Sequence, residues 1–151
     1  MTPTYQLLLI FHVMSAMLWF GGTAFLPRRL REALAVDREE ARRHVDDVLS
    51  QGRIFAIAAT LVLLTGVAMA VFGPGGFGSL PVRYHVALLL TLLWWGLGLF
   101  VVRRNVLKVG EVVAGEADLS SARSFAARVG MFTGIQHALF TATAVLMLWR
   151  M

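Results

Sequence analysis

Residues 12–28 read HVMSAMLWFGGTAFLPR and decide the fold class. The stretch is almost wholly apolar, although a histidine stands at its start and a Leu-Pro-Arg sequence ends it. It belongs to an apolar run over about 5–26, and similar runs follow at about 53–72, 84–102 and 129–149. A helix of about 20 residues crosses the ~30 Å hydrocarbon core of a bilayer. We therefore predict an all-α integral membrane protein, with residues 1–151 forming one antiparallel four-helix bundle.

The composition supports this class and excludes several others. Hydrophobic residues make up 58 % of the chain, whereas a soluble domain has about 45–50 %. There is no cysteine, which removes disulfides and thiolate ligands of a haem or metal. The four runs contain no Asp or Glu, which argues against a proton-coupled carboxylate transporter. No nucleophilic triad, P-loop or dinucleotide fingerprint is present, so the sequence identifies no catalytic residue.

The basic residues are distributed unevenly around the predicted spans. All of the 14 lysines and arginines except Arg83 and Arg150 follow the first or the third span, or stand at the start of the second or fourth. The positive-inside rule then places both of these connections in the cytoplasm and both termini on the outer side of the membrane. Nine acidic residues interleave with the bases, so we expect a lipid bilayer and not nucleic acid as the partner.

The polar connections carry helical signals of their own. Asp37 followed by Glu40 resembles a capping box, which predicts a helix that starts near Arg38 and runs into the second span. Asp118 is a predicted N-cap for the fourth helix, before the membrane. The sequence therefore predicts cytoplasmic helical extensions of the bundle. The connection at 73–83, rich in Gly and Pro, predicts a tight turn on the other side.

Three histidines lie in or at the spans, namely His12, His85 and His137, while His44 lies in a polar connection. A polar side chain within a span usually faces the bundle interior and marks a functional site. At ~1.5 Å rise per residue, His12 and His85 fall at similar depth in the outer half, on helices that are diagonal in an up-down bundle. We expect them to be the two axial ligands of a haem iron. His137 lies deeper and is a second site, a propionate or substrate contact, or a packing residue.

Other residues extend this candidate site. His12 shares a helical stripe with small residues and Trp19, which is either a pocket wall with a stacking ring or a small-residue packing seam. Arg53 either anchors to lipid headgroups or pairs with a carboxylate such as a porphyrin propionate. Met14 and Met17 are possible soft ligands for copper(I), with core filling as the alternative.

These residues resemble a known family. His12, Trp19, the Gly-Gly pair at 21–22 and the exit FLPR at 25–28 are similar to the first-helix motif of the HemJ-type protoporphyrinogen oxidases. The third span begins YHVALL at 84–89, which resembles the family's Leu-His-Val-Lys-Leu. The wider copper-resistance D (CopD-like) membrane superfamily shares the His, Trp and Gly-Gly of the first helix.

The resemblance implies a small bundle in the bacterial inner membrane that binds haem b at His12 and oxidises protoporphyrinogen. Arg53, Thr60 and Gly66 match the family's second-helix pattern. Two features depart from it. Ala87 stands where the family has a haem-binding lysine, so His85 is the expected replacement ligand, and GIQHA at 134–138 lacks the family's fourth-helix acid and proline.

Three hypotheses follow. In the first, the chain is a haem b-binding redox protein, an oxidase of protoporphyrinogen IX or an electron relay, with a tetrapyrrole or quinone as partner. In the second, it is a CopD-like protein that binds or transports copper through His12, His137 and nearby methionines. In the third, it is a structural subunit without a cofactor. Homodimerisation through Gly96 and Gly98 is a further expectation.

Overall fold

The computed structural model describes residues 2–73, 75–115 and 118–148. In these residues the regular structure is all helical, which confirms the all-α part of the prediction. The elements in chain order are α1 (Pro3–Ala24), α2 (Leu26–Ala33), α3 (Arg38–Phe72), the 3₁₀ turn η1 (Phe77–Ser79), α4 (Val82–Gly96), the π-helical segment η2 (Leu97–Val102), α5 (Arg103–Ala114) and α6 (Leu119–Leu148).

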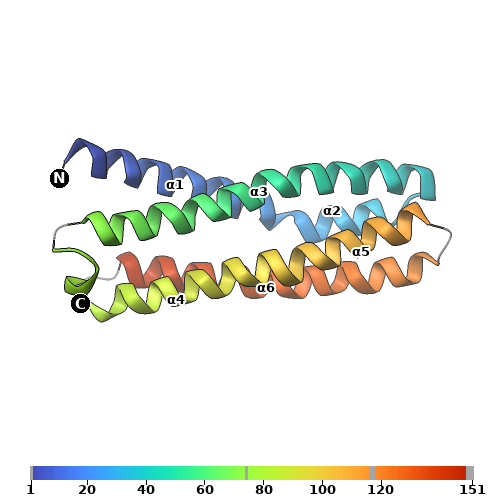
Figure 1. Cartoon of the computed structure of the whole chain (residues 1–151). Coiled ribbons are helices and arrows are strands. Elements are labelled where there is room, and N and C mark those ends of the chain that lie inside the picture. Colours follow the sequence, from blue (N-terminus) through green and yellow to red (C-terminus); the bar gives the residue numbers. More distant parts are fainter. Residues whose placement is uncertain (1, 74, 116–117, 149–151) are drawn as a thin grey trace.

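These elements form four long rods that lie side by side (Figure 1). α1 and α2 make the first rod, α3 the second, α4 with η2 and α5 the third, and α6 the fourth, and the chain direction alternates between them. Each rod is long enough and apolar enough to cross a membrane, as predicted. Large apolar side chains lie exposed along the rods, among them Phe11, Ile57, Leu89 and Met131. Such a surface is compatible with a lipid environment.

Two apolar clusters hold the rods together. One consists of residues from α2, the first half of α3, η2, α5 and the first half of α6, with Leu30, Val45 and Val109 almost fully buried. The other lies further along the bundle and centres on Trp19 and Trp94. Because the first cluster includes α2 and α5, the polar end of the bundle has a packed core of its own.

The predicted helix starts are confirmed. The Asp37 carboxylate accepts a hydrogen bond of 3.0 Å from the backbone N–H of Glu40, at the first turn of α3. Asp118 caps α6 by accepting from Ser120, and these hydrogen bonds hold the pKa of Asp118 below its ordinary value. The guanidinium of Arg38 donates to the Val112 carbonyl at 3.2 Å, which satisfies a carbonyl in the last turn of α5. α3 is thereby tied to the end of α5.

The connection between α3 and α4 is a tight turn, as predicted. Gly75 and Gly76 have φ angles of +84° and +69°, in the left-handed region that favours glycine. One 3₁₀ turn, η1, follows and leads directly into α4. The turn therefore joins two neighbouring rods with few residues.

Candidate functional site

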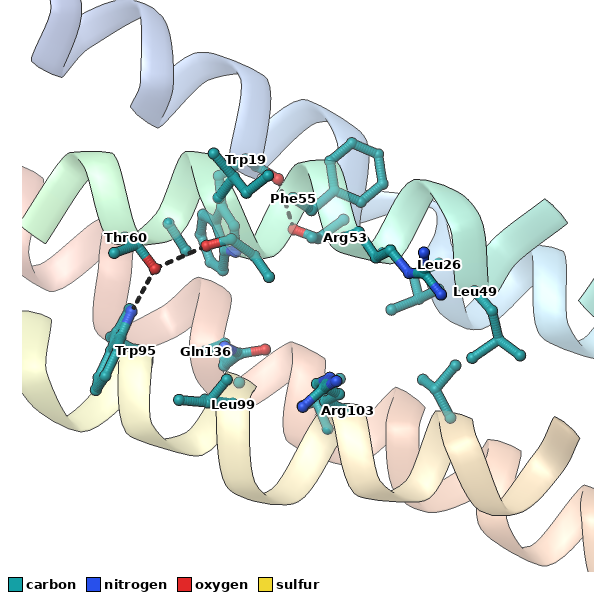
Figure 2. Close-up of a pocket in the computed structure, with 18 of the residues that line it drawn as sticks. Trp19, Leu26, Leu49, Arg53, Phe55, Thr60, Trp95, Leu99, Arg103 and Gln136 are labelled. Atoms are coloured by element: carbon teal, nitrogen blue, oxygen red, sulfur yellow. Dashed lines mark hydrogen bonds between the residues drawn. The ribbon is translucent and has the colours of Figure 1, made fainter. Parts of the chain in front are cut away.

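A cavity of about 410 Å³ separates α3 from η2 and the start of α5 (Figure 2). Its wall is mostly apolar and aromatic, with α1 and α6 contributing the back. The side chains that bring polar atoms to it are Thr23, Arg53, Thr60, Arg103 and Gln136, together with the indoles of three tryptophans. A largely apolar cavity of this size with a few convergent polar groups is typical of a small-molecule site.

Tryptophans form one end of this cavity. The indole N–H of Trp95 donates to the Thr60 hydroxyl at 3.2 Å, and this hydroxyl donates to the Ala56 carbonyl at 2.9 Å, as Figure 2 shows. The bond joins α4 to α3 and closes the gap between them at that level. The rings of Trp19 and Trp94 lie deeper, with centroids 4.5 Å apart. Trp95 is half-buried and can present its indole to a planar ligand, whereas Trp19 and Trp94 are buried against each other.

Two arginines stand at the other end. Arg53 projects from α3 and Arg103 from the first residue of α5, and both side chains lie in the gap between these helices (Figure 2). None of the three ion pairs found among the described residues involves either of them. Two cations without an acidic partner, at one end of an apolar cavity, favour an anionic ligand. Sequence reasoning singled out Arg53 and missed Arg103, which it counted only as a topological charge.

The π-helical segment η2 shapes the same cavity. The backbone N–H of Leu97 contacts the carbonyls of both Leu93 and Trp94, and the side-chain amide of Gln136 donates to the Trp94 carbonyl at 2.8 Å. A Cβ at Gly98 would overlap the Gln136 amide nitrogen, so a larger residue here would displace this amide from its present position. Gly98 therefore allows a close approach within the chain, and dimerisation through Gly96 and Gly98 stays a prediction. Single π turns inside α-helices are frequently found at functional sites.

His12 lies against α3, away from the cavity. Its Nδ1 is 3.0 Å from the Thr65 hydroxyl, and its ring edge faces Gly66. Because Thr65 donates its own hydrogen to the Leu61 carbonyl, its oxygen accepts from the His12 Nδ1–H. The lone pair of a neutral His12 is then on Nε2. A metal-ligating histidine is usually oriented by such a bond from its other nitrogen.

His85 has different surroundings, close to the start of α4. Its ring lies edge-on to Phe77 of η1, with centroids 4.8 Å apart. α1 packs mainly along α3, whereas α4 packs mainly along α6, and no hydrogen bond or ring contact joins His12 to His85 among the described residues. No histidine lines the cavity or the shallower groove beside Gly21. Within the described ranges, no group of three or more His, Asp or Glu side chains is placed to hold a metal ion.

His137 lies directly behind the cavity wall. Its Nδ1 is 2.8 Å from the Thr133 carbonyl, and its Nε2 is 3.3 Å from the Thr23 hydroxyl. Its ring stacks on Trp19 at 5.3 Å with an interplanar angle of 24°. The structure thus brings together Trp19, Arg53 and His137 around one cavity, the first two in its wall and the third in contact with that wall.

No protein-family model, no curated protein and no solved structure matches this chain.

Proposed function

We propose that this chain is a membrane protein that binds a planar tetrapyrrole with two carboxylates and takes part in its oxidation, with a quinone-class acceptor. The observation that carries the proposal is the cavity between α3 and η2, which has tryptophan surfaces at one end and two arginines at the other. The resemblance of the first helix to the HemJ-type family supports the same ligand class.

The chemistry of the wall favours this ligand over a simple lipid chain. Flat aromatic rings stack on indole faces, and the half-buried Trp95 supplies such a face. Guanidinium groups bind carboxylates in a bidentate fashion, and Arg53 and Arg103 are both available at the same end. A ligand with an apolar ring and propionate-like carboxylates on one edge would satisfy both ends at once. Arg53 then has the carboxylate role expected from the sequence, whereas the Trp19 ring packs against Trp94 and His137 in the wall.

Haem itself does not fit the cavity as an iron site. The wall offers only hydroxyl and amide groups from Thr23, Thr60 and Gln136, and haem iron usually takes a histidine, a thiolate or a thioether. The ring proposed for this cavity is therefore metal-free. Haem b bound at His12, with His85 as second ligand, stays a separate prediction, supported by the free Nε2 lone pair that Thr65 leaves on His12.

Titration of the detergent-purified protein with metal-free protoporphyrin IX tests the cavity. We expect a shifted Soret band, and a dissociation constant about five- to tenfold higher in Arg53→Gln and in Arg103→Gln, because each loses one charge-assisted contact. Arg104→Gln is the matched control, since Arg104 is the next arginine along α5 and does not line the cavity. Equal affinities in all four proteins would contradict the proposed site.

The same titration with haemin separates the haem prediction from the cavity. A Soret band with sharp reduced α and β bands, lost in His12→Ala and in His85→Ala, would establish bis-histidine haem. Haemin spectra that do not change in these variants would contradict it. Copper has less support, because Met14 and Met17 are 63 % and 70 % exposed and point away from the bundle interior. If neither porphyrin nor haemin binds, the structural-subunit hypothesis is favoured.

The distribution of basic residues over the fold is consistent with the orientation predicted from the sequence. The basic residues of α2, α5 and the first parts of α3 and α6 lie at one end of the bundle, where Figure 1 shows these segments together. We propose that this end faces the cytoplasm. Since the chain has no cysteine, Gly78→Cys and Ser121→Cys give clean probes. A membrane-impermeant maleimide should label position 78 in intact cells and position 121 only after lysis, and the reverse pattern would invert the topology.

A further inference from the structure

We propose that His137 accepts a proton from the ligand in the cavity through the hydroxyl of Thr23. The inference rests on the proposed function, because it assigns the group that receives a proton when the tetrapyrrole is oxidised. Thr23 belongs to the cavity wall, and His137 lies behind it on α6. The two residues are 114 positions apart in the chain, so only the fold brings them together.

The hydrogen bonds of His137 define which nitrogen is the base. The ring faces two carbonyl oxygens, which only accept: Thr133 lies 2.8 Å from Nδ1 and Phe20 lies 3.4 Å from Nε2. The shorter contact assigns the single hydrogen of the neutral ring to Nδ1. A neutral imidazole carries one N–H, and its lone pair is then on Nε2. This nitrogen is 3.3 Å from the Thr23 oxygen. The backbone thus orients the ring so that its basic nitrogen faces a hydroxyl of the cavity wall, an arrangement typical of general-base sites.

Thr23 is able to pass a proton on. In the resting arrangement its hydroxyl donates to the Trp19 carbonyl at 2.8 Å. Rotation about the Cβ–Oγ bond directs the same hydrogen to Nε2 of His137. When that hydrogen moves to Nε2 and a hydrogen of the ligand moves to the Thr23 oxygen, the hydroxyl is restored and the proton has crossed the wall. The side chain of Thr23 is only 7 % exposed, so bulk water does not compete with this route.

The surroundings of His137 also accommodate the charged ring. After proton transfer, Nδ1–H still points to the Thr133 carbonyl, and Nε2–H has the Phe20 carbonyl at 3.4 Å as an acceptor. The imidazolium would stack on Trp19, which is a favourable cation–π contact. The side chains of α1 beside the ring are Trp19, Phe20 and Thr23. None of these three side chains is ionised near neutral pH. The charged groups of the cavity are the cations Arg53 and Arg103, which favour return of the proton to water after each cycle.

Each two-electron oxidation step removes one hydride and one proton from the porphyrinogen. A C–H bond of a bridging methylene of the porphyrinogen breaks, and its hydride goes to the quinone-class acceptor. One pyrrole N–H loses its proton to Thr23, and the Thr23 hydrogen goes to Nε2 of His137. The electron pair left in the macrocycle extends its conjugation. The reduced acceptor takes a proton from water and becomes the quinol, and His137 later returns its proton to water.

Steady-state oxidation of protoporphyrinogen IX with a soluble quinone tests the relay, with porphyrin fluorescence as the readout. We expect kcat to fall about tenfold or more in His137→Gln and in Thr23→Val, with KM changed less than about twofold, because the proton acceptor is lost while the binding contacts remain. Thr23→Ser keeps the hydroxyl and should recover most of the rate that Thr23→Val loses. Thr91→Val is the control, since Thr91 is also buried and bonded to its own helix, but it does not line the cavity.

A second measurement needs no ligand. In ¹⁵N-histidine NMR spectra of the purified protein, the signals lost in His137→Gln identify His137. We expect its neutral form to carry the hydrogen on Nδ1, and the opposite tautomer would overturn the inference. Oxidation that persists at full kcat in Thr23→Val would overturn the relay and leave the proposed function standing. Absence of oxidation in the parent protein would overturn both.

Discussion

Gly22→Ala should lower the free energy of unfolding by about 1–3 kcal/mol, whereas Gly21→Ala should leave it unchanged or raise it. The two glycines are neighbours in α1, so the substitutions have the same chemistry and the same helix. A Cβ at Gly22 would overlap the aromatic ring of Phe55 on α3, and nothing lies within 4 Å of a Cβ at Gly21. The difference between them therefore measures how tightly α1 packs on α3.

Helix propensity opposes the loss of stability expected for Gly22→Ala. Comparing Gly22→Ala with Gly21→Ala removes this contribution, because it is the same in both variants. Alanine in a helix interior is better than glycine by about 1 kcal/mol, and this gain applies at both positions. At Gly22 it is outweighed only if the Phe55 ring has no alternative position. Urea unfolding in detergent, followed by tryptophan fluorescence, gives both values. Phe55→Leu should rescue Gly22→Ala, because it removes the ring atoms that clash. Equal stability of the two alanine variants would contradict the close packing at Gly22.

The membrane-length helices were predictable because lipid imposes a simple rule. A span needs about 20 apolar residues, whatever its neighbours are, and this length is visible in one sequence. The starts of α3 and α6 were predictable for a local reason as well. Asp37 and Asp118 satisfy backbone N–H groups two or three residues away, so the signal lies within one turn.

The rotation of each helix about its axis was not predictable in the same way. Where a helix is apolar on all sides, periodicity does not show which face meets a neighbour. Depth along the membrane placed His12 and His85 at one level. Depth in the membrane does not tell in which direction around the helix axis a side chain points. In the structure His12 points towards Thr65 on α3, and His85 lies against Phe77.

The cavity depends on contacts between residues that are far apart in sequence. Gln136 reaches the Trp94 carbonyl across 42 positions, at the point where α4 passes into a π-helical turn. No local pattern announces this turn, because its sequence, LGLFVV, is an ordinary apolar segment of a span. In the sequence of this segment, Gly98 was the one indication of a close contact. A small residue in a span indicates a close approach but not the partner, and here the partner is in the same chain.

Gly98→Ala is the substitution that tests this arrangement most directly. We expect it to lower the free energy of unfolding by about 1–3 kcal/mol and to weaken binding of protoporphyrin IX, because the new methyl group displaces the Gln136 amide. The Trp94 carbonyl then loses its 2.8 Å bond inside the bundle, and an amide that is 3 % exposed must find another partner. Gly96→Ala is the matched control, since the nearest atom to its Cβ lies 4.0 Å away.

A double-mutant cycle separates the clash from the lost hydrogen bond. Gln136→Ala alone removes the bond and the amide, and adding Gly98→Ala should cost little more, because the methyl group then has space. The two single changes should therefore sum to more than the double change. Additive effects would mean that Gly98 and Gln136 are not in contact. In that case the wall of the cavity at η2 would not be held by the bond between Gln136 and Trp94.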